Sequence, residues 1–199
     1  TAVMNVLFVA EGLGHFLFFV VACSFAEWGL HNYIMHRPFQ LLFWRLVYAF
    51  KAHALVHHVI YKADYTYHAQ EGDDGKKIPM AWWNSFVIIA IGCSLLTWYF
   101  WFFGWKWLLL AIPTMFAYYG VYEYIHWCMH LPKARRIEQS WIFFRLNGHH
   151  LLHHRYMNKN FNVVLPLADW VLGTLLLRAK TRFAQARGPS VPDVQPLVA

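Results

Sequence analysis

The sequence predicts an all-α integral membrane protein with about three transmembrane helices, plus interfacial or cytoplasmic helices that carry four groups of histidines. Hydrophobic residues make up 59% of the 199 residues and charged residues only 14%, whereas a soluble domain is about half apolar and about a quarter charged. Three apolar segments exceed the roughly 20 residues that cross a bilayer. Most of the 13 histidines fall in pairs or triplets near the ends of these segments. We expect one domain over residues 1–180 and a loosely ordered tail over residues 181–199.

The first predicted span is a nearly continuous apolar segment over residues 3–28. Glu11 and His15 interrupt it one helical turn apart, so they can satisfy each other on one face. The helix is expected to continue beyond this segment and to stop near His36, because Pro38 disfavours helix at the residue before it.

The middle of the chain alternates between interfacial and spanning character. Residues 39–58 mix aromatic and apolar residues with basic ones, which predicts an amphipathic helix at the membrane surface. Residues 61–77 are polar and predict a loop. Residues 78–103 and 106–126 predict the second and third spans, and the short connection between them predicts a tight helical hairpin.

The distribution of basic residues predicts the topology. From residue 131 onward the chain is polar and basic, with a short apolar return over residues 163–177. If the histidine-bearing ends share one side, Lys106 is the only one of the 17 Lys and Arg residues on the other side. The positive-inside rule then makes the histidine side cytoplasmic. The sequence does not distinguish a bacterial inner membrane from the endoplasmic reticulum. A nucleic-acid partner is not expected, because the basic residues form no stripe on an otherwise polar domain.

Ten histidines form four groups, called boxes here: His31 and His36; His53, His57 and His58; His126 and His130; His150, His153 and His154. Residues three or four apart lie on the same helix face. We therefore expect two imidazoles to point at one spot in each of three pairs: His53/His57, His126/His130 and His150/His154. The first box has a spacing of five, which separates its rings by about 140° on a regular helix. We expect the helix to end or reorient between them.

This concentration of imidazoles predicts a di-metal site. Imidazole suits zinc, copper, iron and nickel and binds as the neutral base. Ten histidines are too many for one ion, but two ions would each receive four or five nitrogens, with room left for water or dioxygen. Haem held by facing histidine pairs is the rival interpretation, although it usually needs histidines within spans. His15 and His68 stand alone and are not expected to bind metal.

Two carboxylates lie one helical turn before a histidine. Glu123 precedes His126 by three residues, as in the Glu-x-x-His motif of di-iron bundles, and Glu27 precedes His31 by four. Each either orients a ligand imidazole through its other N–H or pairs with a nearby Lys or Arg. Cys128 is expected to face away from the metal.

The four boxes, in this order, resemble the histidine boxes of the fatty acid hydroxylase/sterol desaturase superfamily. The segment from Asn160-Phe161-Asn162 to Asp169-Trp170 and Gly173-Thr174 is similar to that family's closing pattern, so the resemblance covers residues 15–177. Asn162 stands where the family often has glycine, which asparagine can replace if the backbone needs a positive φ. His149 is an additional histidine, so the fourth box could also begin there. His149 and Asp169 join Glu27 and Glu123 as possible extra ligands or hydrogen-bond partners of ligands.

The resemblance implies an oxygen-dependent enzyme with a non-haem di-iron centre that hydroxylates an unactivated C–H bond of a lipid. Desaturation of the same substrate class is the alternative, and a non-enzymatic membrane protein that binds or transports metal is the alternative from another class. The implied cofactors are two iron ions, with dioxygen as co-substrate, and zinc is a possible substitute in purified protein. The chain has no flavin, cytochrome b5 or iron–sulfur motif, so a separate electron-transfer protein of the ferredoxin, rubredoxin or cytochrome b5 type is expected. Its docking surface would use basic residues near the boxes: Lys133, Arg135, Arg136, Arg145, Arg155 and Lys159.

Overall fold

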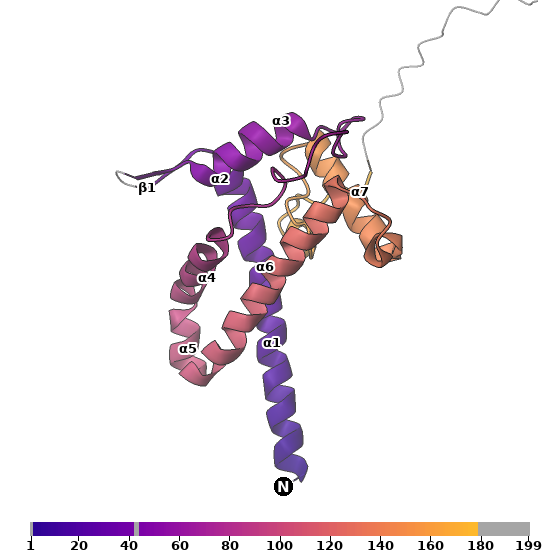
Figure 1. Ribbon diagram of the computed structural model, residues 1–199. Helices are drawn as coiled ribbons and strands as arrows, with labels where there is room; N and C mark the ends of the chain where they lie inside the picture. Colours follow the sequence, from indigo (N-terminus) through magenta and orange to yellow (C-terminus); the bar gives the residue numbers. More distant parts are fainter. Residues whose placement is uncertain (1, 42–43, 179–199) are drawn as a thin grey trace, which may run out of the picture.

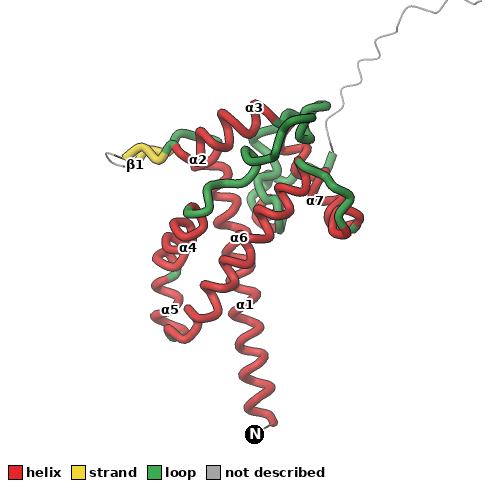
Figure 2. The backbone as a smooth tube through the Cα atoms, viewed as in Figure 1, coloured by secondary structure: helices red, strands yellow, loops and turns green. Residues whose placement is uncertain are grey.

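The fold of this computed structural model is described for residues 2–41 and 44–178, and it is mainly helical (Figures 1 and 2). The predicted tail over residues 181–199 lies outside the described residues. The elements in chain order are α1 (Ala2–Leu30), η1 (His31–Met35), β1 (Phe39–Leu41), β2 (Trp44–Leu46), α2 (Tyr48–Phe50), η2 (Lys51–His57), α3 (His58–Ile60), α4 (Asn84–Leu95), α5 (Thr97–Phe103), η3 (Trp105–Trp107), α6 (Leu108–His130), η4 (Arg136–Gln139), α7 (Trp141–Arg155) and α8 (Leu167–Val171).

The long helices α1 and α6 pack against each other, and α4 packs on α6 (Figure 1). Far from the histidine boxes, an apolar cluster joins α1, α5, η3 and α6 through Phe19, Tyr99, Phe100, Trp107 and Ala111. His15 is buried beside this cluster, with Nε2 3.6 Å from the Glu11 carboxylate, as the one-turn spacing predicted. The predicted helical hairpin is therefore present, with Gly104 at a φ of 102° in its connection.

Among the described residues, one helix is long and apolar enough to cross a membrane, over Val6–Met35. The second predicted span is divided into α4 and α5, which together pass the same test but are bent by 52° at their junction. Within the described residues, α6 does not reach this apolarity, because histidines, tyrosines and Glu123 interrupt its sequence. A membrane protein with three spans therefore stays a prediction.

The prediction of one amphipathic helix over residues 39–58 is only partly correct. β1 and β2 form an antiparallel pair in which Phe39 lies opposite Leu46, and the helical segment starts only at Tyr48. Pro38 keeps the chain out of helix at this point. In a continued helix these backbone N–H and C=O groups would be paired within the helix. Here β1 and β2 pair them with each other.

Two π-helical turns, η1 and η2, lie at the first and second boxes. In η1 the His36 N–H donates to the His31 carbonyl at 3.1 Å, and in η2 the His58 N–H donates to the His53 carbonyl. A π-turn closes its hydrogen bond after five residues. Residues five apart therefore share a face, and the His31 and His36 rings stack with centroids 5.1 Å apart. The helix was expected to end or reorient between His31 and His36. It does so by changing from α-helical to π-helical winding at His31.

A second apolar cluster joins α6, α7 and the chain after α7 beside the boxes. It consists of Tyr122, Ile125, Cys128, Met129, Phe143, Leu146 and Val163. Cys128 belongs to this packing and not to a metal-ligand group, as expected from its place between the two histidines of the third box. The cluster places α7, which carries the fourth box, against the histidine end of α6.

Candidate metal centre

The ten histidines of the four boxes meet in two clusters of five. Within each cluster, one ligand atom from every residue lies within 4.8 Å of the others. Nine of the ten side chains are buried, and His36 is partly buried. Cluster 1 consists of His31, His36, His53, His58 and His153, and cluster 2 consists of His57, His126, His130, His150 and His154. Either cluster could hold a metal ion.

The five rings of cluster 1 meet through their Nε2 atoms, in the order His31, His53, His58, His153, His36. The four successive Nε2–Nε2 distances are 2.8, 3.0, 3.2 and 3.0 Å. η1 supplies His31, the residue directly after η1 is His36, η2 supplies His53, α3 supplies His58 and α7 supplies His153.

Cluster 2 has the same form, in the order His126, His57, His154, His150, His130. Its successive Nε2–Nε2 distances are 3.2, 3.3, 3.0 and 3.2 Å. Both ends of this run come from α6, where residues four apart share a face, as predicted for this pair and for the pair on α7.

These distances fit metal coordination. Histidine nitrogens bind zinc at about 2.0–2.1 Å, so two nitrogens at right angles around one ion lie about 3 Å apart. Backbone carbonyls fix the direction of four rings by accepting from Nδ1: Phe161 for His31, Tyr67 for His130, Lys159 for His153 and Tyr61 for His154. A carbonyl only accepts, so these Nδ1 atoms carry the hydrogen and Nε2 offers its lone pair to the cluster centre.

Three further rings depend on the cluster itself for their orientation. The Nδ1 atoms of His57, His126 and His150 are buried and have no hydrogen-bond partner among the described residues. All three belong to cluster 2, and coordination through Nε2 would fix the direction of rings that no hydrogen bond at Nδ1 fixes. The donor set and its geometry therefore fit a bound cation.

Burial keeps the cluster histidines outside the long helices neutral. It lowers the pKa of His53, His57, His150 and His154 well below the usual range, and repulsion between neighbouring rings adds to this. The pKa of His153 falls to about 3, first through burial and then through His36. The pKa of His36 falls to about 4 through burial and the charge of Arg37. Neutral imidazole is the form that binds metal.

The structure divides one pair that was expected to share a spot. His53 and His57 lie in different clusters, because the π-turn η2 aligns His53 with His58 instead. Neighbouring residues in a helix point about 100° apart, so His57 and His58 serve different clusters. His153 and His154 on α7 divide in the same way.

The two glutamates form hydrogen bonds away from the ligand rings. Glu27 accepts from the Tyr118 hydroxyl at 2.6 Å and from the Val163 N–H at 2.5 Å, so it ties α1 to α6 and to the segment before α8. Glu123 accepts from the Tyr119 hydroxyl at 2.7 Å and from the Met80 N–H at 3.2 Å. Neither is placed in a metal-ligand group, and both organise the walls around the centre.

His149 lies outside both clusters, so the fourth box contributes His150. The His149 Nε2 lies 3.2 Å from the Asp169 carboxylate. Asp169 is fully buried and also accepts from the backbone N–H groups of Phe161 and Asn162, at 2.9 and 2.7 Å. Asp169 thereby fixes the turn at Phe161, and the carbonyl of Phe161 orients the His31 ring. Asp169 therefore influences cluster 1 without contacting it.

Asn162 does not adopt the positive φ considered for it. The positive φ, 56°, belongs to Asn160. Asn162 instead uses its side chain, donating to the Ser24 carbonyl at 2.8 Å and accepting from the Asp169 N–H at 3.1 Å. A glycine could not make these two contacts.

The loop over residues 61–77 covers cluster 2, which its polar composition did not reveal. Tyr61 is fully buried and its ring centroid lies 4.9 Å from that of His130. Tyr67 packs on the same ring at 4.7 Å. The contribution of both residues to orientation comes from backbone carbonyls, which no side-chain motif identifies.

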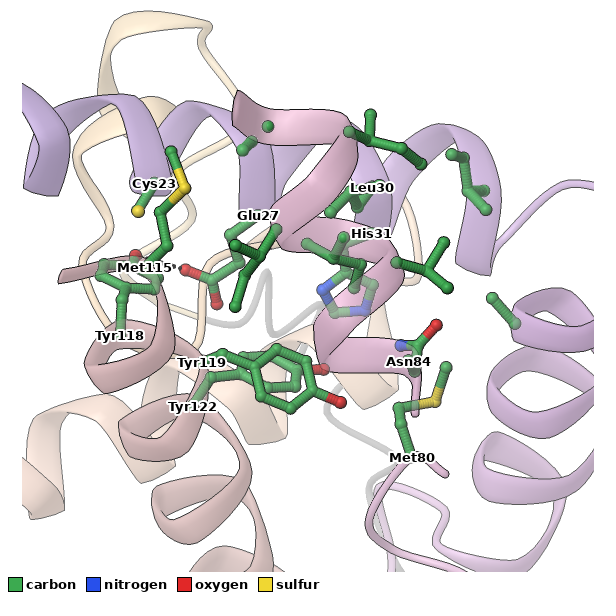
Figure 3. A pocket seen from close by; sticks show the side chains of 18 of the residues that line it. Cys23, Glu27, Leu30, His31, Met80, Asn84, Met115, Tyr118, Tyr119 and Tyr122 are labelled. Carbon is green, nitrogen blue, oxygen red and sulfur yellow. Dashed lines mark hydrogen bonds between the residues drawn. The ribbon is translucent and has the colours of Figure 1, made fainter. Parts of the chain in front are cut away.

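A cavity of about 510 Å³ lies between α1, α4 and α6 and reaches His31 of cluster 1 (Figure 3). Its wall is mostly apolar and includes His31 of cluster 1. Tyr122 also lines it and stacks on His126 of cluster 2, with centroids 5.7 Å apart and an interplanar angle of 26°. The cavity therefore meets cluster 1 directly and is separated from cluster 2 by the Tyr122 ring.

Comparison of the chain with protein families, curated proteins and solved structures finds no match. The class of protein is therefore defined by the site alone: a helical protein with two buried five-histidine groups and an apolar cavity beside them.

Proposed function

We propose that the two clusters bind two iron ions and that the protein uses dioxygen to hydroxylate an unactivated C–H bond of a lipid. The observation that carries this proposal is the meeting of two five-nitrogen clusters at the end of an apolar cavity. Bound iron would supply one-electron and dioxygen chemistry. Five nitrogens around one ion would leave room for water or dioxygen beside it. The order of the boxes, which resembles the fatty acid hydroxylase/sterol desaturase superfamily, supports the same choice.

The cavity supports an apolar substrate of limited size. Small-molecule sites commonly have volumes of about 300–1,000 Å³, and this cavity of about 510 Å³ falls within that range. The residues that line it include the polar Glu27 and Asn84 (Figure 3). A chain held along this cavity would present one segment to His31, and such positioning decides which C–H bond reacts. Desaturation would need the same placement of the lipid chain beside the metal centre, but its product would carry a double bond in place of a hydroxyl group.

The surroundings of the site fit an integral membrane enzyme that receives electrons from a separate protein. The apolar helix over Val6–Met35 ends at cluster 1. Exposed basic residues lie near the third and fourth boxes in the sequence. They agree with a cytoplasmic location of the boxes. They also agree with docking of an acidic carrier of the ferredoxin, rubredoxin or cytochrome b5 type. Four of them are Lys133, Arg136, Arg145 and Arg155.

The decisive experiment measures metal and product on the same preparation. Protein purified in mild detergent from iron-replete cells is expected to contain two irons per chain. With dioxygen and a chemical reductant it should incorporate one labelled oxygen atom into a lipid extract. Zinc-loaded protein, reconstituted anaerobically with iron, should gain the same activity. Two bound metals with no oxidised lipid after iron reconstitution would favour the non-enzymatic alternative, and the absence of bound metal would contradict the proposal altogether.

A further inference from the structure

The segment from Leu165 to Thr174, which contains α8, lies beside α1 and not beyond its C-terminal end. Ser24 of α1 donates to the Leu165 carbonyl at 2.7 Å and accepts from the Ala168 N–H at 3.2 Å. One turn higher, the Trp28 indole donates to Thr174 at 2.8 Å. These contacts fix α8 beside the last third of α1.

The position of these contacts along α1 gives the depth of α8. The apolar helix Val6–Met35 has 30 residues, and at 1.5 Å per residue it is about 45 Å long, the thickness of a bilayer with its headgroups. Ser24 lies 11 residues before Met35, or about 16 Å below that end. The headgroup layer accounts for only about 7 Å of this depth. α8 is therefore level with lipid chains.

The outer surface of α8 is apolar. Trp170 and Val171 are 68% and 55% exposed, and Leu172 follows them at 44%. A soluble protein rarely exposes such residues together, and their inner neighbours Ala168 and Asp169 are fully buried. The exposed side is therefore a defined face and not a poorly packed end.

The first turn of α7 presents a second apolar surface. Phe143 and Leu146 are buried against α6, whereas Trp141, Ile142 and Phe144 are each more than 60% exposed. Arg145 lies over the Trp141 ring at 5.2 Å. Indole rings accompanied by basic side chains are typical of the headgroup level of a membrane.

We propose that the first turn of α7 and the outer face of α8 form a wedge in the lipid leaflet that borders the metal centre. Its partner is phospholipid, continuous with the lipid around α1. Apolar faces supply the attachment, and the positive charge of Arg145, Arg155 and Lys159 near α7 favours anionic headgroups. This inference rests on the membrane placement that we propose for α1, and it is independent of the metal and the reaction.

The test uses spin labels on single cysteines in an otherwise cysteine-free, full-length chain. Labels replace Phe144 and Trp170, and matched labels replace Val9 on the exposed face of α1 and Asp74 in the exposed loop after α3. The protein is reconstituted in vesicles of phosphatidylcholine and phosphatidylglycerol. Collisions with dioxygen, which concentrates in lipid, are compared with collisions with a water-soluble nickel chelate.

Labels at 144 and 170 are expected to follow the label at 9, with preference for dioxygen over nickel. Nickel accessibility like that at 74, with position 9 still in lipid, would overturn the wedge while leaving the membrane placement intact. Shielding from both reagents would show a covering protein and would also overturn it. Nickel accessibility at all four positions would remove the membrane placement itself.

Discussion

His57 and His58 are adjacent in the chain, yet they serve different clusters. The Nε2 of His58 lies 3.0 Å from that of His53, whereas the Nε2 of His57 lies 3.2 Å from that of His126. The two clusters are thus linked through the peptide bond between His57 and His58, where η2 meets α3, and through the one between His153 and His154 on α7. Each cluster nevertheless has its own five nitrogens, so the two sites can be emptied separately.

Alanine at either of these two positions should weaken one metal site and spare the other. His58→Ala removes a nitrogen from cluster 1, and His57→Ala removes one from cluster 2. We expect each variant to lose one of its two ions to a chelator more than about 100-fold more readily, since changing a mere hydrogen-bond partner of a ligand already costs about 10–100-fold in affinity. The double variant should lose both. His68→Ala, in the exposed part of the loop after α3, is the matched control, and equal loss from it would contradict the assignment.

Asp169→Asn should loosen cluster 1 from a distance. The substitution keeps the size of the side chain but weakens a fully buried acceptor of the Phe161 and Asn162 N–H groups. A buried hydrogen-bonding group left without its partner costs about 1–3 kcal/mol, so the melting temperature should fall. Metal should also leave cluster 1 before cluster 2, because the carbonyl that orients His31 lies in the same turn. Asp74→Asn, at an exposed position, provides the control.

Acid should destabilise the metal-free protein. Folding lowers the pKa of His36 to about 4 and that of His153 to about 3, from about 6.5 in an unfolded chain. Between these values the unfolded chain binds more protons than the folded protein, so the free energy of unfolding falls as the pH drops below about 6.5. Thermal unfolding in detergent at several pH values measures this. Bound metal should oppose the loss, and a metal-free protein equally stable on both sides of this range would contradict the burial of neutral rings.

Filling the cavity should reduce turnover without removing metal. Ala22 and Ala26 line the cavity on α1, and phenylalanine at either position would occupy space that the substrate needs. We expect lipid oxidation to fall about tenfold or more, which corresponds to about 1.4 kcal/mol in the activation free energy. Bound metal should remain at the level of the unmodified protein. Val9→Phe, on the exposed face of the same helix, tests whether added bulk on α1 is harmful by itself.

Patterns of spacing predicted the parts of this molecule that depend on local geometry. The helices that end at His36 and His130 and the pairing of Glu11 with His15 follow from residue types and helical period. The π-turn at His53 does not, because its winding departs from the regular period on which the prediction relied. The partner of Glu27 also escaped prediction, since Val163 lies 136 residues further along the chain. Contacts over such distances depend on the tertiary fold and leave no local pattern.

The two runs of Nε2 contacts also constrain how the protein is made. Cluster 1 joins His31 to His153, and cluster 2 draws two of its five nitrogens from α7. A growing chain that has not yet reached α7 therefore offers three nitrogens to the second site and four to the first. Neither site is complete until nearly the whole described chain has left the ribosome, so an ion that needs all five nitrogens would be bound only at the end of synthesis.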